Sequence, residues 1–273
     1  MHSDAIKTGP DHAAARAMLR GTGRTPQDIR KPLIAVVHSW TDVSPCNINL
    51  RDLAQEVKKG VTEAGGTPIE FNTIAITDGI AMGSPGMRAS LASREVITDS
   101  TELAVRGHCL DGVVVLCGCD KTIPAAAMAL ARLDLPGLML YGGSIMPGTH
   151  RGRKITIQDV FEAVGAHAAG TMDDVELEEI EGEACCGAGA CGGQFTANTM
   201  ALATSLMGLA PMGANEIPAP DPAKLVAARA CGVRVMELLR EGISARSFIT
   251  PESIRNAAVA ATATAGSTNA VLH

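Results

Sequence analysis

Short apolar runs alternate along this chain with longer stretches in which apolar residues recur every three or four positions. Runs of the first kind are typical of buried β-strands, and the longer periodic stretches are typical of amphipathic α-helices. The pattern therefore predicts strands over residues 32–40, 67–76, 110–118 and 136–143, and helices over residues 50–66, 93–108, 125–133 and 196–210.

Strands that alternate with helices favour right-handed crossovers and a mostly parallel sheet. The expected fold is therefore a three-layer α/β/α arrangement, with helices on both faces of the sheet. In such sheets ligands bind beyond the carboxyl ends of the strands. The loops expected at that edge carry the unusual residues of the chain, which are Cys46, Asp78, Cys119, Asp120, Lys121 and Cys191.

The pattern changes in the second half of the chain. Residues 150–183 are expected to form a helix followed by an acidic connector, and residues 210–222 a Pro-rich surface loop. The loop that carries Cys191 leads into a helix for which Thr196 or Asn198 is the expected N-cap.

The domain organisation follows from the same pattern. Residues 1–31 form an N-terminal extension and residues 32–273 one α/β domain. The chain stops at His273 in the first turn of an apolar helix. Natural domains rarely end there, so we expect a fragment of a longer protein.

Composition and charge narrow the class of ligand. Of the 273 residues 46% are apolar, which is enough for a full core, and the formal net charge is −6. No basic stripe is available to neutralise a phosphate backbone, which argues against a nucleic-acid partner. No apolar signal segment opens the chain, and the longest apolar run is interrupted by charges and proline. We expect an intracellular protein that binds small molecules and no membrane.

The eight cysteines are too sparse for a disulfide scaffold. Cys109, Cys117 and Cys231 are interpreted as small hydrophobic core residues. Cys46, Cys119 and Cys191, in the loops expected at the sheet edge, lie more than 70 residues apart in the sequence, which excludes a local zinc finger. Three thiolates without an evident fourth suit an iron–sulfur cluster with one open iron, able to act as a Lewis acid on a substrate hydroxyl.

The neighbouring polar residues suggest a second metal. Asp78 and Asp120 are hard oxygen donors suited to magnesium, although a lone aspartate in a turn is usually a turn former. Lys121 leaves three alternatives open. Its amine points away to a substrate carboxylate, or is converted to a carbamate that binds metal, or is a solvent-exposed group in the first turn of a helix.

Two other patterns carry less weight. Gly187, Gly189 and Gly192 match the dinucleotide pattern GxGxxG, but an acidic segment precedes them instead of an apolar strand. The pairs Cys185–Cys186 and Cys117–Cys119 do not have the CxxC spacing of redox thiols.

Six segments together resemble one family: PCNINL, ITDGIAMG, SREVITDS, GCDKTIPAAAMALARLDLPGLMLYGGSIMPG, GAGACGGQFTANTMA and GSTNAVLH. They are similar to the dihydroxy-acid dehydratases of branched-chain amino-acid synthesis, within a larger family that also handles sugar acids and phosphogluconate. Members are much longer, with a C-terminal β-barrel domain that supplies a magnesium-binding glutamate and the serine thought to be the catalytic base. The resemblance therefore implies the N-terminal part of a dehydratase, without that barrel and inactive alone.

The resemblance also implies roles for individual residues. By similarity, Cys46, Cys119 and Cys191 hold a 2Fe-2S cluster, and Asp78, Asp120 and a carbamylated Lys121 bind Mg²⁺. The implied reaction removes water from 2,3-dihydroxyisovalerate or 2,3-dihydroxy-3-methylvalerate to give a 2-oxo acid. The full-length protein is expected to be a homodimer in the cytoplasm, or in an organelle if a transit peptide has been removed.

Alternatives remain. A sugar-acid dehydratase of the same family, a cluster-binding module without catalysis, and a metal-free fragment with packed cysteines would each share these residues. The sequence also departs from the family at Cys186, where proline is common, and at Gln194, where methionine is usual. Neither position is a proposed ligand, although Cys186 could offer the cluster a competing thiol.

Overall fold

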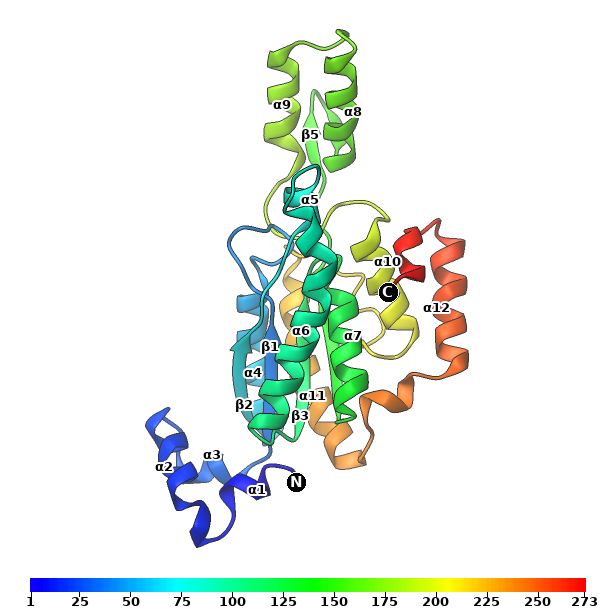
Figure 1. Ribbon diagram of the computed structural model, residues 1–273. Helices are drawn as coiled ribbons and strands as arrows, with labels where there is room; N and C mark the ends of the chain where they lie inside the picture. Colours follow the sequence, from blue (N-terminus) through cyan, green and yellow to red (C-terminus); the bar gives the residue numbers. More distant parts are fainter.

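A parallel four-stranded sheet forms the centre of the computed structural model, which describes residues 1–273 (Figure 1). Neighbouring strands are parallel throughout, as predicted, and lie in the order β2-β1-β3-β4. The strands are β1 (Leu33–His38), β2 (Thr67–Asn72), β3 (Gly112–Cys117) and β4 (Gly137–Tyr141).

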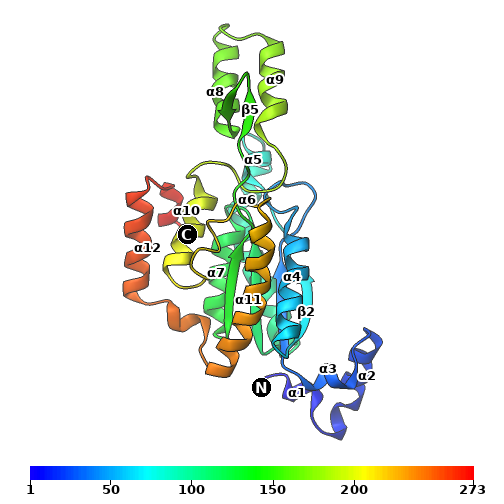
Figure 2. The ribbon, with the colours of Figure 1, turned by 180° about the vertical axis from the view of Figure 1, so that it is seen from behind.

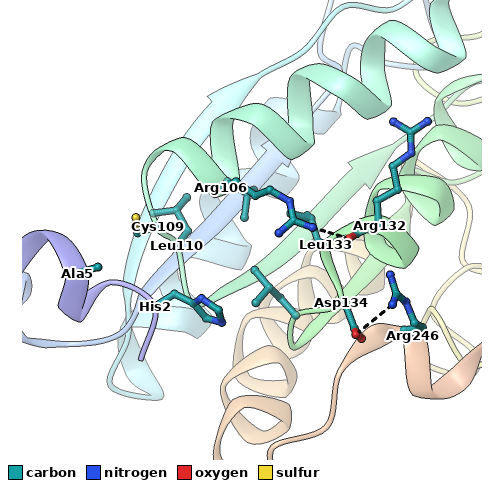
Figure 3. Close-up of a pocket in the computed structure, with 11 residues that line it drawn as sticks. His2, Ala5, Arg106, Cys109, Leu110, Arg132, Leu133, Asp134 and Arg246 are labelled. Carbon is teal, nitrogen blue, oxygen red and sulfur yellow. Dashed lines mark hydrogen bonds and ion pairs between the residues drawn. The ribbon is translucent and has the colours of Figure 1, made fainter.

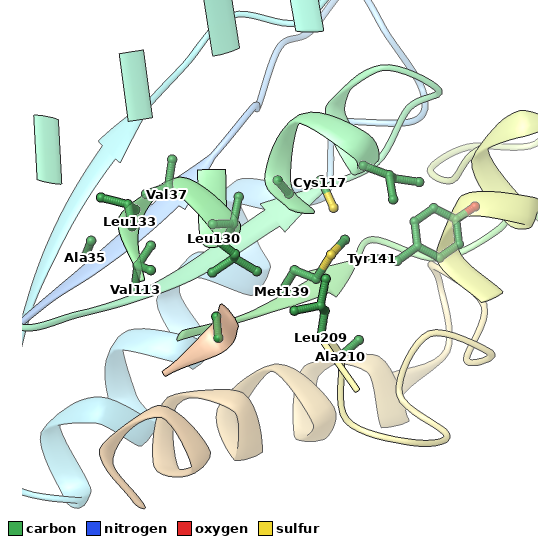
Figure 4. Packing of buried hydrophobic residues seen from close by; sticks show 14 of the residues in the cluster. Ala35, Val37, Val113, Cys117, Leu130, Leu133, Met139, Tyr141, Leu209 and Ala210 are labelled. Carbon is green, nitrogen blue, oxygen red and sulfur yellow. The ribbon is translucent and has the colours of Figure 1, made fainter. Parts of the chain in front are cut away.

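Helices cover both faces of the sheet, which confirms the predicted three-layer arrangement (Figures 1 and 2). Ala35 and Val37 of β1 point into a cluster of 24 buried residues shared with α6 and α7, part of which is drawn in Figure 4. Ile34 and Val36 point into a second cluster of 17, shared with α4 and α11. Because alternate side chains of a strand face opposite sides, a strand buried on both faces has to be apolar throughout. These four helices are α4 (Leu50–Glu63), α6 (Met87–Gly107), α7 (Thr122–Leu133) and α11 (Pro222–Glu241).

The helix α11 is not predicted by the pattern of apolar and polar residues. A local signal was available, because Asp221 accepts a hydrogen bond from the Ala223 amide and a proline occupies the first helical turn. Small residues let this helix touch α4 closely: a Cβ on Gly60 of α4 would overlap the Arg229 carbonyl oxygen of α11. This packing is a tertiary contact that periodicity does not reveal.

An arm projects from the end of the sheet at which α5 lies (Figures 1 and 2). Its small core consists of Ile155, Ala163, Ile180 and Ala184. The chain enters and leaves the arm side by side, because Pro147 forms an isolated antiparallel bridge with Cys185. The elements of the arm are β5 (Gly148–His150), β6 (Arg153–Ile155), α8 (Ile157–Ala168) and α9 (Asp174–Ala184).

The expected acidic connector in this region is wrong, because that segment is the helix α9. Asp173 caps it by accepting a hydrogen bond from the Glu176 amide. Arg151, in the turn between β5 and β6, pairs with Glu176 at 2.8 Å and with Glu179 at 3.0 Å. Acidic residues near the N-terminus suit the helix dipole, and the arginine offsets part of the remaining charge.

The N-terminal 31 residues form short helices tied to the sheet by one buried carboxylate. Asp111 accepts hydrogen bonds from the Ser3 amide at 2.9 Å, from the Ser3 hydroxyl, and from the Leu33 amide at 2.8 Å. The segment contains α1 (Asp4–Lys7), η1 (Pro10–His12), α2 (Ala13–Gly21) and α3 (Pro26–Arg30).

Asp111→Ala is expected to release this segment, because two donors of Ser3 and one of Leu33 lose their acceptor. Proteolytic cleavage within residues 1–31 should become about tenfold faster, since local opening governs cleavage. Mass spectrometry of a limited digest measures the rate, and Asp11→Ala, at an exposed position of η1, is the control. Equal rates in wild type and Asp111→Ala would show that other contacts hold the segment.

The remaining elements lie after the arm and in the loop that follows β2. The expected final helical turn is a 3₁₀ helix, η3. No helix has the length and apolar character that crossing a membrane requires. These elements are α5 (Asp78–Ala81), α10 (Thr196–Leu206), η2 (Ala245–Phe248), α12 (Pro251–Ala263) and η3 (Thr268–Val271).

Candidate functional site

The six candidate residues occupy four segments beyond the strands. Cys46 follows β1, and Asp78 begins α5 in the loop after β2. Cys119, Asp120 and Lys121 fill the turn from β3 to α7, and Cys191 lies between α9 and α10. The carboxyl ends of parallel strands meet at one edge, so the first three segments converge there, and Cys191 reaches the same edge from outside the sheet.

The three cysteines form a buried group. Cys46 and Cys119 are 4% and 3% exposed, and Cys191 is half-buried. Hydrogen bonding with Cys119 and Cys191, followed by burial, raises the pKa of Cys46 well above its usual range. The same interaction with Cys46 lowers the pKa of Cys191. The side chains of the three cysteines are therefore close enough to affect one another's pKa values.

The turn that carries Cys119 is fixed by two local features. The Thr122 hydroxyl accepts hydrogen bonds from the amides of Gly118 at 3.1 Å and Cys119 at 2.8 Å. Gly118 also lies against the loop after β1, where any Cβ would overlap the carbonyl oxygen of Cys46. Glycine at this position is what allows the segments of Cys46 and Cys119 to touch.

The two aspartates face Lys121. Its ammonium lies 2.9 Å from an oxygen of Asp78 and 3.5 Å from an oxygen of Asp120. Lys121 is only 5% exposed, so it is neither a solvent-exposed lysine nor turned away from the carboxylates. Burial, and then the charge of Asp78, raise the pKa of Asp120, while Lys121 acts in the opposite direction.

Three further residues adjoin this group and were missed from the sequence. The buried Ser90 of α6 donates a hydrogen bond to Asp78. Arg94, one turn later, lies 3.1 Å from Nδ1 of His273. Burial, followed by the charges of Lys121 and Arg94, lowers the pKa of His273 to about 4, and its Nε2 has no hydrogen-bond partner. Helical spacing from Ser90 to Arg94 was a usable signal, because it puts both on one face.

The donor sets can be tested against the expected metals. No group of three or more His, Cys, Asp or Glu side chains is arranged to hold a metal ion. Asp78 and Asp120 do not form a metal site here because the positively charged Lys121 ammonium lies between them, in the place that a metal ion would take, and neutralises part of their charge. Magnesium therefore fits only if that amine loses its positive charge. The thiols of Cys46, Cys119 and Cys191 are the type of ligand that an iron–sulfur cluster requires, although as placed here they do not form a site for a single metal ion.

The predicted N-cap of α10 is wrong. Phe195 occupies that position and its side chain caps nothing. Thr196 instead shares a hydrogen bond with Ser267 at 2.9 Å, and Asn198 donates to the Cys191 carbonyl at 3.0 Å. Both side chains bind neighbouring segments instead of the free amides at the start of α10, because packing around the Cys191 loop brings other hydrogen-bond partners within reach.

The other sulfur atoms lie apart from the candidate site or at its margin. Cys117 and Cys231 are buried core residues, as interpreted, whereas Cys109 is only partly buried and belongs to no core cluster. Cys185 and Cys186 are exposed, and the Cys186 thiol donates to the Glu183 carbonyl at 3.1 Å. All eight cysteines are free thiols.

The cavity of about 560 Å³ drawn in Figure 3 lies at the opposite edge of the sheet. Its three arginines are all engaged. Arg106 pairs with Glu102 at 2.8 Å, Arg132 pairs with Asp99 at 2.5 Å, and Arg246 lies 3.4 Å from Asp134. With their charges offset in this way, they form no evident anion site, and none of the six candidate residues lines the cavity.

Comparison with known proteins gives concordant matches. A family profile described as dihydroxy-acid/6-phosphogluconate dehydratase N-terminal matches residues 31–273. The chain is 60% identical over 271 residues to a dihydroxy-acid dehydratase of Koribacter versatilis, covering 99% of this chain and 47% of that protein. It is 53% identical to dihydroxy-acid dehydratases of Roseiflexus castenholzii and Thermus thermophilus, covering 100% of this chain and 49% of each. The chain thus spans about half the length of the curated relatives it matches.

Proposed function

Because this chain belongs to the dihydroxy-acid/6-phosphogluconate dehydratase family, we propose that it is the N-terminal half of a hydro-lyase that converts 2,3-dihydroxy acids to 2-oxo acids. The observation that carries the proposal is the gathering of three thiols beside two carboxylates and a buried lysine at one sheet edge. The relatives are named dihydroxy-acid dehydratases. Together with the resemblance carried by the sequence segments, this makes 2,3-dihydroxyisovalerate and its methylvalerate homologue our proposed substrates, and valine, leucine and isoleucine synthesis the proposed pathway.

In the proposed reaction a proton leaves carbon 2 and the hydroxyl leaves carbon 3. The products are water and an enol, which tautomerises to the 2-oxo acid. Cys46, Cys119 and Cys191 would hold a 2Fe-2S cluster, which when bound supplies a Lewis acid for the leaving hydroxyl. Burial of Cys46 and Cys119 would exclude water from that side of the substrate. The catalytic base is proposed to lie outside this chain.

Asp78 and Asp120 would hold Mg²⁺, which when bound neutralises the substrate carboxylate and the developing enolate. Carbamylation of Lys121 would turn the cation between them into a third anionic oxygen ligand. Ser90 supports this role by fixing one oxygen of Asp78 and leaving the other directed at Lys121. The homologues are bacterial enzymes, so we place the full-length protein in the cytoplasm, and we propose that it forms a homodimer.

Anaerobic reconstitution with iron and sulfide tests the cluster assignment. We expect about two irons per chain, with the visible absorption of a 2Fe-2S centre, and loss of both in Cys46→Ser, Cys119→Ser and Cys191→Ser. Cys231→Ser, a buried cysteine of the second core cluster, is the matched control and should retain the iron.

Two results would count against the proposal. Iron that survives loss of Cys119 would show that the ligands are assigned wrongly. A wild-type chain that binds no iron, tested beside a full-length relative that does, would show that this half does not build the site.

A further inference from the structure

Cys191 needs positioning that the other two cysteines do not. Cys46 and Cys119 lie eight and two residues after the ends of β1 and β3, in loops that leave the sheet itself, whereas the Cys191 loop only passes the sheet edge. Its first part is held by the backbone: the Ile145 amide donates to the Ala190 carbonyl at 2.8 Å, and the Gly189 amide donates to the Pro45 carbonyl at 2.8 Å. These contacts end one residue before the cysteine.

The part of the loop that follows is bound by the side-chain amide of Asn198, beside one local backbone bond from the Gly193 amide to the Cys191 carbonyl at 2.9 Å. The Asn198 Nδ2 group donates to the Cys191 carbonyl at 3.0 Å and to the Gly193 carbonyl at 2.6 Å. Its Oδ1 accepts from the Tyr141 hydroxyl at 2.8 Å. Because both N–H groups are used on carbonyls, the amide oxygen has to face the tyrosine, and the orientation of the side chain is determined.

Tyr141, which donates to Asn198, is held in a fixed position by the core. It is the last residue of β4 and is 1% exposed, so its ring is held by the core while its hydroxyl reaches α10. Burial, followed by the nearby cysteines, raises the pKa of Tyr141 well above its usual range, so the phenol keeps the proton that it donates. The chain of contacts therefore runs from the sheet, through one helix residue, to the backbone of Cys191.

We propose that Asn198, oriented by Tyr141, is the positioning residue that keeps Cys191 beside Cys46 and Cys119 in the arrangement a cluster requires. That this arrangement serves a cluster rests on the proposed function, whereas the hydrogen bonds of Asn198 are present without any metal. Asn198 touches neither cluster nor substrate in this role and acts only through the Cys191 loop.

The test uses variants that keep side-chain shape. Asn198→Asp puts an acceptor where two carbonyls need a donor, and Tyr141→Phe removes only the hydroxyl. Asn256→Asp, at an exposed position of α12, controls for the change of charge. In the metal-free chain, alkylation of each cysteine is followed by mass spectrometry and normalised to the exposed Cys186.

We expect Cys191 to react about tenfold faster in Asn198→Asp and a few-fold faster in Tyr141→Phe, because loop opening governs access to the thiol. Cys46 and Cys119 should keep their wild-type rates. After reconstitution, both variants should show an altered cluster absorption spectrum, and Asn256→Asp should match wild type in both measurements.

Unchanged Cys191 reactivity in both variants would overturn the proposal. So would a rise shared equally by all three cysteines in Tyr141→Phe, since that indicates general unfolding. A wild-type chain that binds no iron would contradict the proposed function but not the role of Asn198. The alkylation rates are measured in the metal-free chain, so they decide separately whether Asn198 positions Cys191.

Discussion

Gly118→Ala is expected to destabilise the fold by about 3 kcal/mol or more and to abolish iron binding. The added Cβ would overlap the carbonyl oxygen of Cys46 and approach its carbonyl carbon to 2.8 Å. Both atoms belong to the backbone, so no flexible side chain can move aside. The loop after β1 has to shift, and Cys46 moves away from Cys119 as it does so.

Urea unfolding of the metal-free chain measures the stability, and iron content after reconstitution measures the second effect. Gly182→Ala is the matched control, because Gly182 lies inside α9 with open space around its Cβ position. Alanine there should stabilise by about 0.5–1 kcal/mol and leave iron binding unchanged. Wild-type stability and iron content in Gly118→Ala would show that the close approach of the two loops is not required.

Lys224→Met is expected to cost about 2–4 kcal/mol at neutral pH. Lys224 is fully buried, and its amine donates to the Tyr141 carbonyl at 3.1 Å and to the Ala214 carbonyl at 2.7 Å. These two acceptors belong to the end of β4 and to the loop before α11. Methionine fills the same space but leaves both carbonyl oxygens without a donor.

The same lysine makes stability depend on pH. Burial lowers the pKa of Lys224 from 10.5 to about 8 in the folded chain. Between these values the unfolded chain binds more protons than the folded one, so the free energy of unfolding should rise as pH increases from 8 to 10.5, by up to about 3 kcal/mol. Below pH 8 the contribution is constant and unfavourable.

Urea unfolding at pH 7.5 and at pH 10 measures this contribution. A chain that keeps Lys224 gains stability as pH rises and Lys224→Met does not, so the difference in the free energy of unfolding between them should widen with pH. Lys59→Met, at an exposed position of α4, should follow the wild-type pH profile. A gap that narrows toward high pH would mean that the two carbonyls keep Lys224 protonated in spite of its burial.

The sheet could be predicted from the sequence because its strands are continuous apolar runs. β1 and β3 are buried along their whole length, and such strands differ clearly from the amphipathic helices between them. Much of the site could be predicted once the strands were assigned, because the carboxyl ends of parallel strands bring Cys46, Asp78 and Cys119 to one edge of the sheet.

What the sequence could not provide depends on contacts between distant segments. α11 packs against both α4 and the sheet, so its buried residues do not form a simple apolar stripe. α9 is acidic in the sequence, and the ion pairs of Arg151 became apparent only in three dimensions. Asn198 looked like a helix cap, and its true partners are two carbonyls of the preceding loop and one distant hydroxyl. Whether Lys121 faces the aspartates likewise required side-chain positions.

The bridge between Pro147 and Cys185 gives the arm adjoining ends. A unit with adjoining ends and its own small core is, in evolutionary terms, a removable module: residues could be gained or lost at its tip without changing the register of any strand. The length of the arm is constrained only at its base, because Cys185 lies six residues before Cys191 and a change there would move the candidate ligand. Variation in length is therefore least restricted in the turn between α8 and α9, the part of the arm farthest in sequence from that junction.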